Sequence, residues 1–178
     1  EEGFSIEIEY EDKKGLSKLE YSIYKKEKQR KKNGYKIKSQ KELLGNFRCV
    51  LFYPDDLMIT KGGPELRRDF LNIGISQCYP LYIDYYAGMK KALENRNHLL
   101  KDASKGNYYD DKELDAWSSV MADYSSYIYI YRREYIKKLE VYAKKVIDDI
   151  SSKNENLSFF YKSNIEENSS LNREEIRK

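Results

Sequence analysis

The feature that most constrains the fold of this 178-residue chain is an apolar stripe between Asp110 and Ile150. Its members step by three and four residues, which places them on one face of a helix. They are Leu114, Trp117, Met121, Tyr124, Ile128, Tyr131, Tyr135, Leu139, Tyr142 and Val146. We predict one helix of about 40 residues, and hence of about 60 Å at 1.5 Å per residue. A domain of this size cannot bury such a helix, so it must project or lie along a partner.

The preceding residues supply an antiparallel mate for this helix. Pro64 and Pro80 suit the first turns of two helices, over residues 64–73 and 81–103. Gly106 then ends the second of them. Because the connection to the long helix is short, the two helices should pair in opposite directions. The second helix carries an apolar stripe of its own, formed by Tyr82, Tyr86, Met89, Leu93 and Leu100.

The first part of the chain alternates between apolar and polar side chains, which predicts strands with one solvated face. Residues 4–10 and 19–23 follow this pattern. Asn33 and Gly34 predict a tight hairpin turn, because both central residues of a type I′ turn need a positive φ. Residues 35–37 would then form the returning strand.

The stretch that follows has weaker signals. Ser39 can cap a short helical turn that ends at Gly45. Residues 47–53 are almost continuously apolar and predict a buried strand. Residues 54–63 are expected to be an irregular connector, and residues 157–161 predict one more strand.

These elements predict an α+β fold, with an antiparallel, strand-rich subdomain followed by a projecting antiparallel helical arm. We expect the subdomain and its basic hairpin in residues 1–63. The arm should occupy residues 64–155, with its long helix over 110–150. Residues 156–178 should hold a returning strand and a truncated polar tail.

Basic residues concentrate between Lys13 and Lys41, where twelve Lys and Arg face two Glu, a local charge of +10. Since the whole chain carries +3, the remainder carries −7. Clustered lysines can neutralise phosphates and release counterions, so the cluster is a candidate for DNA contact. The alternative is a solvated sheet edge whose lysines discourage strand pairing. The candidate DNA-binding residues are Lys25, Lys26, Lys28, Arg30, Lys31, Lys32, Lys36 and Lys38.

The sequence shows no catalytic centre. Lys61–Pro64 does not match a phosphate-binding loop, because proline replaces the lysine and removes an N–H group. The single histidine, His98, rules out a site with two histidine ligands. Asp55 and Asp56 follow a proline and are expected to cap a helical turn rather than to bind metal. We therefore expect no catalytic residue, no metal ligand and no cofactor. The apolar runs are also too short for a membrane span, so a cytoplasmic protein is expected.

Five ordered motifs between Val50 and Lys101 resemble the central stretch of the RecF family of bacterial recombination and repair proteins. In this sequence they are Phe52–Leu57, Gly62–Pro64, Arg67–Asn72, Gln77–Pro80 and Arg96–Leu100. Asn72 departs from the family pattern, which usually has aspartate at that position. The resemblance implies structural or interface roles for Pro54, Asp56, Gly62, Pro64, Arg67, Arg68, Phe70, Arg96, Asn97 and Arg132.

The resemblance also implies that the chain lies between the Walker A phosphate loop and the signature and Walker B motifs of an ATPase head like those of SMC and ABC proteins. The intact parent is expected to bind ATP and Mg, to form an ATP-dependent homodimer, and to act as a slow DNA-dependent ATPase. It should bind single-stranded, gapped or junction DNA and help RecO and RecR to load recombinase. The fragment itself is expected to be a non-enzymatic module that contacts DNA and partners.

The alternative to a repair module is an adaptor or scaffold protein whose long helix docks a partner. Individual residues leave similar choices open. Arg67 and Arg68 point about 100° apart on a helix, so one can pair with a carboxylate such as Glu65 or Asp69 while the other faces the nucleotide lobe or DNA. Arg96 and Asn97 would form either a hydrogen-bonded network against the long helix or a partner contact.

Overall fold

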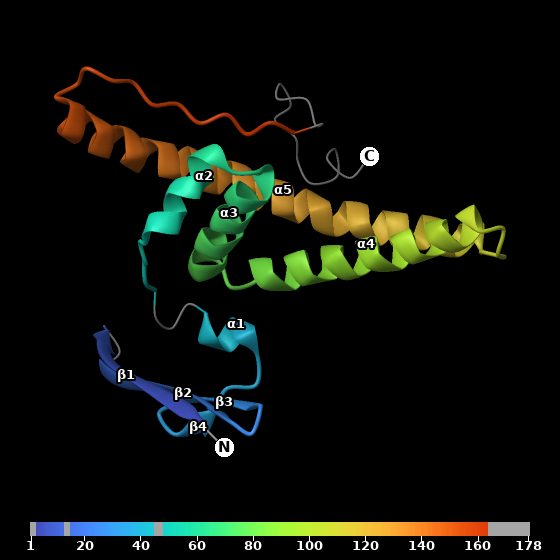
Figure 1. Cartoon of the computed structure of the whole chain (residues 1–178), viewed down its shortest axis with the longest axis horizontal. Coiled ribbons are helices and arrows are strands. Elements are labelled where there is room, and N and C mark those ends of the chain that lie inside the picture. The colour runs from blue at the N-terminus through green and yellow to red at the C-terminus, as the bar shows by residue number, and fades with distance from the viewer. Residues whose placement is uncertain (1–2, 13–14, 45–47, 164–178) are drawn as a thin grey trace. The chain divides into compact units, whose positions relative to one another are not determined.

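The computed structural model describes residues 3–12, 15–44 and 48–163. It divides into two compact units, residues 1–50 and 51–178, a division that precedes the predicted boundary at residue 63. The first unit is built on an antiparallel sheet and the second on long helices, which confirms the α+β class (Figure 1).

The sheet contains four antiparallel strands in chain order: β1 (Phe4–Asp12), β2 (Gly15–Tyr24), β3 (Glu27–Lys32) and β4 (Tyr35–Lys36). The predicted turn is confirmed, since Asn33 and Gly34 have φ values of 50° and 81°. A second tight turn was not predicted. It joins β2 to β3 through Lys25 and Lys26, whose φ values are 49° and 69°.

A short helix, α1 (Gln40–Leu43), follows the sheet. The backbone N–H of Glu42 donates to Oγ of Ser39 over 3.2 Å, so the predicted cap is confirmed. The Glu42 carboxylate in turn accepts from the N–H of Lys38 at 3.0 Å. The predicted end of this turn, Gly45, lies outside the described residues.

The prediction of a buried strand over residues 47–53 is wrong for the residues that the structure describes. Residues 48–53 have no regular secondary structure, and Val50, Leu51 and Phe52 are 98%, 77% and 74% exposed. A strand requires hydrogen-bonded neighbours, and none of β1–β4 pairs with this run. Apolar composition alone cannot supply that partner.

The predicted connector over residues 54–63 contains two short helical segments, η1 (Pro54–Leu57) and α2 (Met58–Lys61). The carboxylate of Asp56 accepts from the N–H of Tyr53 at 3.0 Å, which agrees with the capping role predicted for this acidic pair. Helix α3 (Pro64–Cys78) begins at the predicted proline and continues beyond the predicted end at residue 73.

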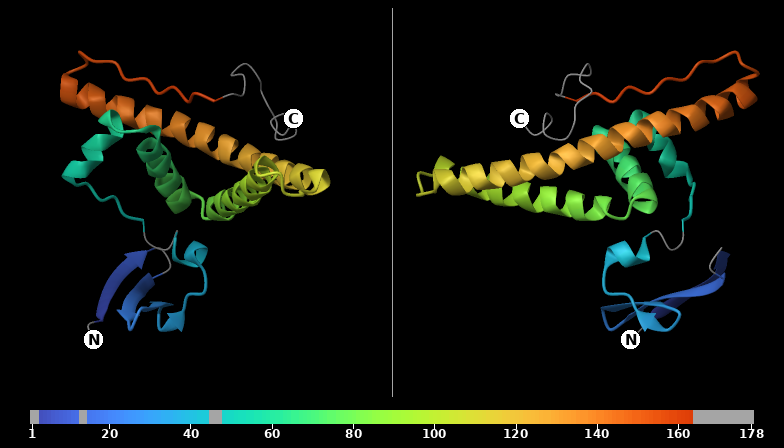
Figure 2. Two further views of the ribbon diagram at one scale, coloured as in Figure 1. Left: turned by 45° about the vertical axis from the view of Figure 1, so that its right-hand side comes forward. Right: turned by 180° about the vertical axis from the view of Figure 1, so that it is seen from behind.

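The helical hairpin is confirmed. Helix α4 (Tyr82–Ser104) packs antiparallel to the first half of α5 (Asp111–Ser151), an unbroken helix of 41 residues (Figures 1 and 2). The side chain of Asp110 caps α5 by accepting from the N–H of Lys112 at 2.9 Å. Gly106, at φ 76°, makes the turn between the helices. No helix in the described part of the chain is long and apolar enough to cross a membrane.

The core of the helical unit lies where α3, α4 and α5 meet, and it is centred on Ile75, Tyr82 and Ile128. Aromatic packing continues along the hairpin, where the rings of Tyr85 and Tyr127 stack with centroids 4.2 Å apart. These two tyrosines pack between the helices, although neither belongs to the predicted apolar stripes.

The chain reverses direction after α5, where Ser152 and Lys153 adopt left-handed backbone conformations. The following residues run back along α5 (Figure 2), and the ring of Tyr161 lies 5.7 Å from that of Tyr129. Residues 157–161 are thus extended, but within the described residues they pair with no strand, unlike the predicted returning strand. The polar tail from residue 164 onward lies outside the described residues.

Candidate nucleic-acid interface

The eight basic residues predicted to contact DNA surround β3. Lys25 and Lys26 form the β2–β3 turn. Strand β3 itself contains Lys28, Arg30, Lys31 and Lys32. Lys36 lies in β4, and Lys38 follows it. The hairpin therefore brings together the eight basic residues that the sequence predicts as one cluster.

The cross-strand register divides this cluster between the two sides of the sheet. Residues directly opposite each other on paired strands share a face. Lys28, Arg30 and Lys32 lie opposite Ile23, Tyr21 and Leu19, so they share the apolar side of the sheet. We call this side face A. Its members include Phe4, Ile6, Ile8, Leu19, Tyr21, Ile23, Lys28, Arg30, Lys32 and Tyr35.

The opposite side, face B, mixes amines with carboxylates. Lys31 lies opposite Glu20 on β2 and opposite Lys36 on β4. Glu7 lies opposite Glu20, and both are on this side. Because acidic neighbours compensate the amines here, face B is a weaker site for phosphate. Its charged members are Glu7, Glu9, Glu11, Lys18, Glu20, Glu27, Lys31 and Lys36.

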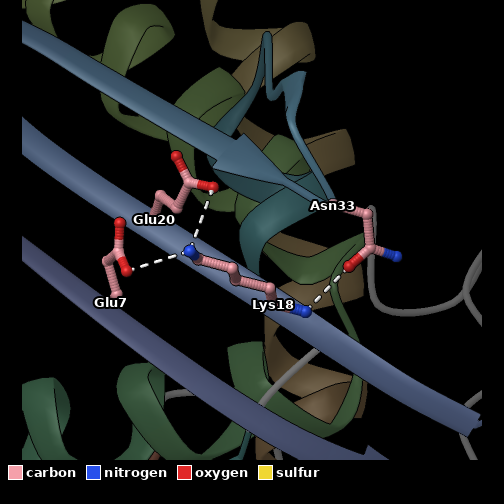
Figure 3. A network of polar contacts seen from close by, with 4 residues as sticks. All are labelled: Glu7, Lys18, Glu20 and Asn33. Carbon is pink, nitrogen blue, oxygen red and sulfur yellow. Dashed lines mark hydrogen bonds and ion pairs between the residues drawn. The ribbon is translucent and has the colours of Figure 1, made fainter.

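Lys18 is the centre of the charge network on face B (Figure 3). Its Nζ lies 2.9 Å from a carboxylate oxygen of Glu7 and 4.0 Å from one of Glu20. The hydrogen bond to Glu7 raises the pKa of Lys18 above its usual value. The backbone N–H of Lys18 also donates to Oδ1 of Asn33 at 2.7 Å, which fixes the β3–β4 turn against β2.

The paired arginines of α3 have separate partners, as their angular separation predicts. Arg68 forms a surface ion pair with Glu65 at 2.9 Å. Arg67 donates from Nη1 to the carbonyl oxygens of Ile59 and Gly62, both at 3.1 Å. Because Gly62 is the C-cap residue of α2, Arg67 holds the end of that helix against α3.

The start of α3 does not fit a nucleotide phosphate. Pro64, in the first turn, provides no N–H, and the carboxylate of Glu65 reaches back toward Gly63, where an added Cβ would lie 2.5 Å from it. A phosphate there would meet a like charge. No group of three His, Cys, Asp or Glu in the described residues could hold a metal ion.

The remaining motif residues are partly exposed or exposed. Pro54 opens η1, and Phe70 of α3 is 46% exposed. Arg96 of α4 donates from Nε to Oγ of Ser118 on α5 at 3.0 Å, a contact with the long helix that corresponds to the first of the two alternatives. Asn97 points to solvent and does not extend that network.

A second polar network joins three helices around Arg132 of α5. Arg132 donates from Nη2 to Oδ1 of Asn72 at 2.9 Å and from Nε to the hydroxyl of Tyr82 at 3.2 Å. The Tyr82 hydroxyl donates to the same Asn72 oxygen at 2.6 Å. Burial raises the pKa of Tyr82. Burial works to lower the pKa of Arg132, but hydrogen bonds and charge interactions with Tyr82 and Tyr161 raise it overall.

Sequence reasoning selected Arg132 but missed Asn72 and Tyr82 as its partners. Tyr82 lies 10 residues from Asn72 and 50 from Arg132, each on a different helix. Tyr82 was read only as part of an apolar stripe. The one available signal was the departure of Asn72 from the family pattern.

Comparison with known proteins connects this geometry to one family. No family model matches the chain. The chain is 36% identical over 149 residues to the DNA replication and repair protein RecF of Clostridioides difficile, a match that covers 84% of the chain and 39% of that protein. It is 35% identical over 179 residues to RecF of Ruminiclostridium cellulolyticum, covering 99% of the chain and 48% of the relative.

The fold agrees with these matches. A solved structure of the recombination mediator protein RecF with ATP, from the RecFOR pathway, superposes with a TM-score of 0.85 at 31% identity. The match covers 99% of this chain and 48% of the solved one. The chain corresponds to part of a RecF-family protein. It spans less than half the length of the RecF relatives it matches, and a second RecF structure gives a TM-score of 0.76 over 85% of the chain.

Proposed function

We propose that this chain is a DNA- and partner-contacting module of a RecF-like recombinational repair protein. The observation that supports this most strongly is the RecF–ATP structure, which matches 99% of the chain at a TM-score of 0.85. The basic hairpin around β3 supplies the DNA contact, because its cations neutralise backbone phosphates. DNA binding of this kind is independent of sequence and weakens as salt rises.

The intact protein binds ATP with Mg, dimerises around it, and works with RecO and RecR to load recombinase on gapped or junction DNA in the cytoplasm. Arg67 and Arg68 lie at the start of α3, in the motif that would adjoin the nucleotide lobe. The 178-residue chain carries no phosphate-binding loop, so ATP turnover belongs to the rest of the protein, which acts as a slow DNA-dependent ATPase. Purified chain should neither bind ATP tightly nor hydrolyse it.

The experiment that tests DNA contact is a salt titration of duplex binding. If about four phosphates are engaged, the log–log slope is about −3.6, at roughly 0.9 per phosphate. Changing Lys25, Lys26, Lys31 and Lys32 to Gln should flatten the slope. Changing Arg67 and Arg68 to Gln should leave it nearly unchanged, because their guanidinium groups already bind Gly62, Ile59 and Glu65. An unchanged slope in the hairpin variant would refute the DNA contact.

A second candidate function, an adaptor that docks a partner on its long helix, is favoured by one observation. The last part of α5 exposes apolar side chains on neighbouring turns: Val141 at 68%, Tyr142 at 72%, Val146 at 54% and Ile150 at 76%. An adaptor without a DNA role would show no salt-dependent DNA binding, so the titration above separates the two functions.

A further inference from the structure

The structure assigns a single-stranded nucleic-acid site to face A of the sheet, with the backbone following the cations of β3 and a base stacked on Tyr35. This inference rests on the proposed DNA-binding function and narrows it to one face, one row of side chains and one form of nucleic acid. All residues of this site lie in the sheet unit, residues 1–50.

The first observation is the row formed by Lys28, Arg30 and Lys32. Alternate residues of a strand point to the same face and lie about 6.7 Å apart. That distance is about twice the rise of 3.4 Å per nucleotide along one strand of DNA. A strand of nucleic acid parallel to β3 with this rise can therefore place every second phosphate beside successive cations. Arginine at the centre of the row adds a planar donor group suited to phosphate.

The second observation is the aromatic ring at the end of the row. Tyr35 lies directly opposite Lys32 in the β3–β4 ladder and is 81% exposed. A hollow of about 450 Å³ adjoins it and is lined by Lys32, Asn33, Tyr35, Lys36, Ile37 and Glu42. An exposed tyrosine beside such a hollow offers a face on which any base can stack.

The third observation is the contrast between the two faces. Lys31 and Lys36 share face B with Glu7 and Glu20, where phosphate would be repelled as well as attracted. On face A the cationic row adjoins apolar side chains, among them Phe4 at 51% and Ile6 at 52% exposure. A surface that combines cations with aromatic and apolar groups favours unpaired bases over a duplex, whose bases are stacked within the helix.

The test measures binding of the 178-residue chain to a fluorescent oligothymidylate, to the same oligomer with abasic sites, and to a duplex. The row variant changes Lys28, Arg30 and Lys32 to Gln. A matched control changes Lys31, Lys36 and Lys38 to Gln, which removes the same charge mainly from the other face. A third variant, Lys28→Arg with Lys32→Arg, keeps the row charged and guards against a folding effect.

We expect the row variant to reduce the salt slope on single strands by about 2, from roughly 0.7 per phosphate over three phosphates. The control triple should reduce it by less than half as much, and the arginine variant should keep the parental slope. Equal losses in both triples would overturn the assignment to face A while leaving DNA binding intact. If the parental chain binds none of the three oligomers, the proposed DNA contact itself fails.

A separate set of variants tests base stacking on Tyr35. Tyr35→Ala should weaken oligothymidylate binding by about tenfold, and Tyr35→Phe should retain most of the affinity. Neither change should matter on the abasic oligomer, where there is no base to stack. Tyr24→Ala is the aromatic control, because Tyr24 is 59% exposed but lies opposite Glu27 on face B. Tighter binding to duplex, with no effect of Tyr35→Ala, would overturn the single-strand site.

Discussion

Arg132 of α5 and Asn72 of α3 form a hydrogen bond of 2.9 Å, although they lie 60 residues apart in the sequence. Asn72 is 8% exposed, and its Nδ2 is buried with no hydrogen-bond partner among the described residues. The hydrogen-bond partners of the guanidinium, Asn72, Tyr82 and Tyr161, are all neutral. A partly buried cation is thus held by an amide and two hydroxyl groups, while a buried amide donor is left unused.

Replacing this amide with a carboxylate should stabilise the helical unit. Asn72→Asp removes the unused donor and gives Arg132 an opposite charge, an exchange worth about 1–2 kcal/mol. The midpoint of thermal unfolding should rise by about 2–8 °C. Asn97→Asp on the exposed side of α4 is the control and should change little. Because Arg132 lowers the pKa of the new carboxyl, the gain should be complete above about pH 4 and disappear as pH falls below it.

Removing the cation should be much more harmful. Arg132→Met keeps the aliphatic stem but leaves the oxygen of Asn72 and the hydroxyl of Tyr82 with fewer partners inside the core. We expect a loss of about 2–4 kcal/mol in the free energy of unfolding, measured by urea denaturation. Arg133→Met, one position along the same helix, is the comparison. Equal losses in the two variants would show that the network contributes nothing specific.

Gly88 of α4 allows close approach to α5. A Cβ at this position would lie 2.5 Å from the ring of Tyr124. Gly→Ala in a helix ordinarily stabilises by about 1 kcal/mol, but here the steric conflict should outweigh that gain and destabilise by about 1–3 kcal/mol. The variant Tyr124→Ala removes the ring. Adding Gly88→Ala to that variant should then cause no further loss in the free energy of unfolding. Stabilisation by Gly88→Ala alone would contradict the packing seen here.

The raised pKa of Tyr82 predicts how the stability of the helical unit changes at alkaline pH. Burial raises its pKa in the folded state, so the neutral phenol contributes stability that is complete below about pH 10 and is lost as pH rises through the folded value. Helical circular dichroism should therefore fall above about pH 10. Tyr82→Phe should weaken this pH dependence, although it lowers stability at neutral pH. Tyr108→Phe, at a position that is 92% exposed, should leave the pH dependence unchanged.

The long helix and the β3–β4 turn were predictable because their signals are local. The stripe that ends at Val146 has helical period, and Asn33-Gly34 is a strong turn sequence. The faces of the basic hairpin were not predictable in the same way. They depend on the turn at Lys25 and Lys26, which has neither glycine nor asparagine, and a shift of one residue there would exchange the two faces.

The Arg132 network and the exposed run at residues 48–53 could not be predicted from the sequence, for a different reason. Each depends on which residues lie opposite it in space. The partner of Arg132 is set by how α3 crosses α5, which no spacing along the sequence encodes. For Leu51 and Phe52, the composition typical of a buried strand says nothing about whether a neighbouring strand is present.

The position of Arg132 along α5 has a mechanical consequence. It lies near the middle of the 41-residue helix, about 30 Å from the end at Asp111 at 1.5 Å per residue. The remainder of that half is stiffened by α4, which runs beside it. Rotation of this rigid rod by about 5° around Arg132 would therefore displace its tip by about 2.6 Å. A small rearrangement among three side chains in the core would be magnified at the far end of the hairpin into a displacement as large as the radius of the helix backbone.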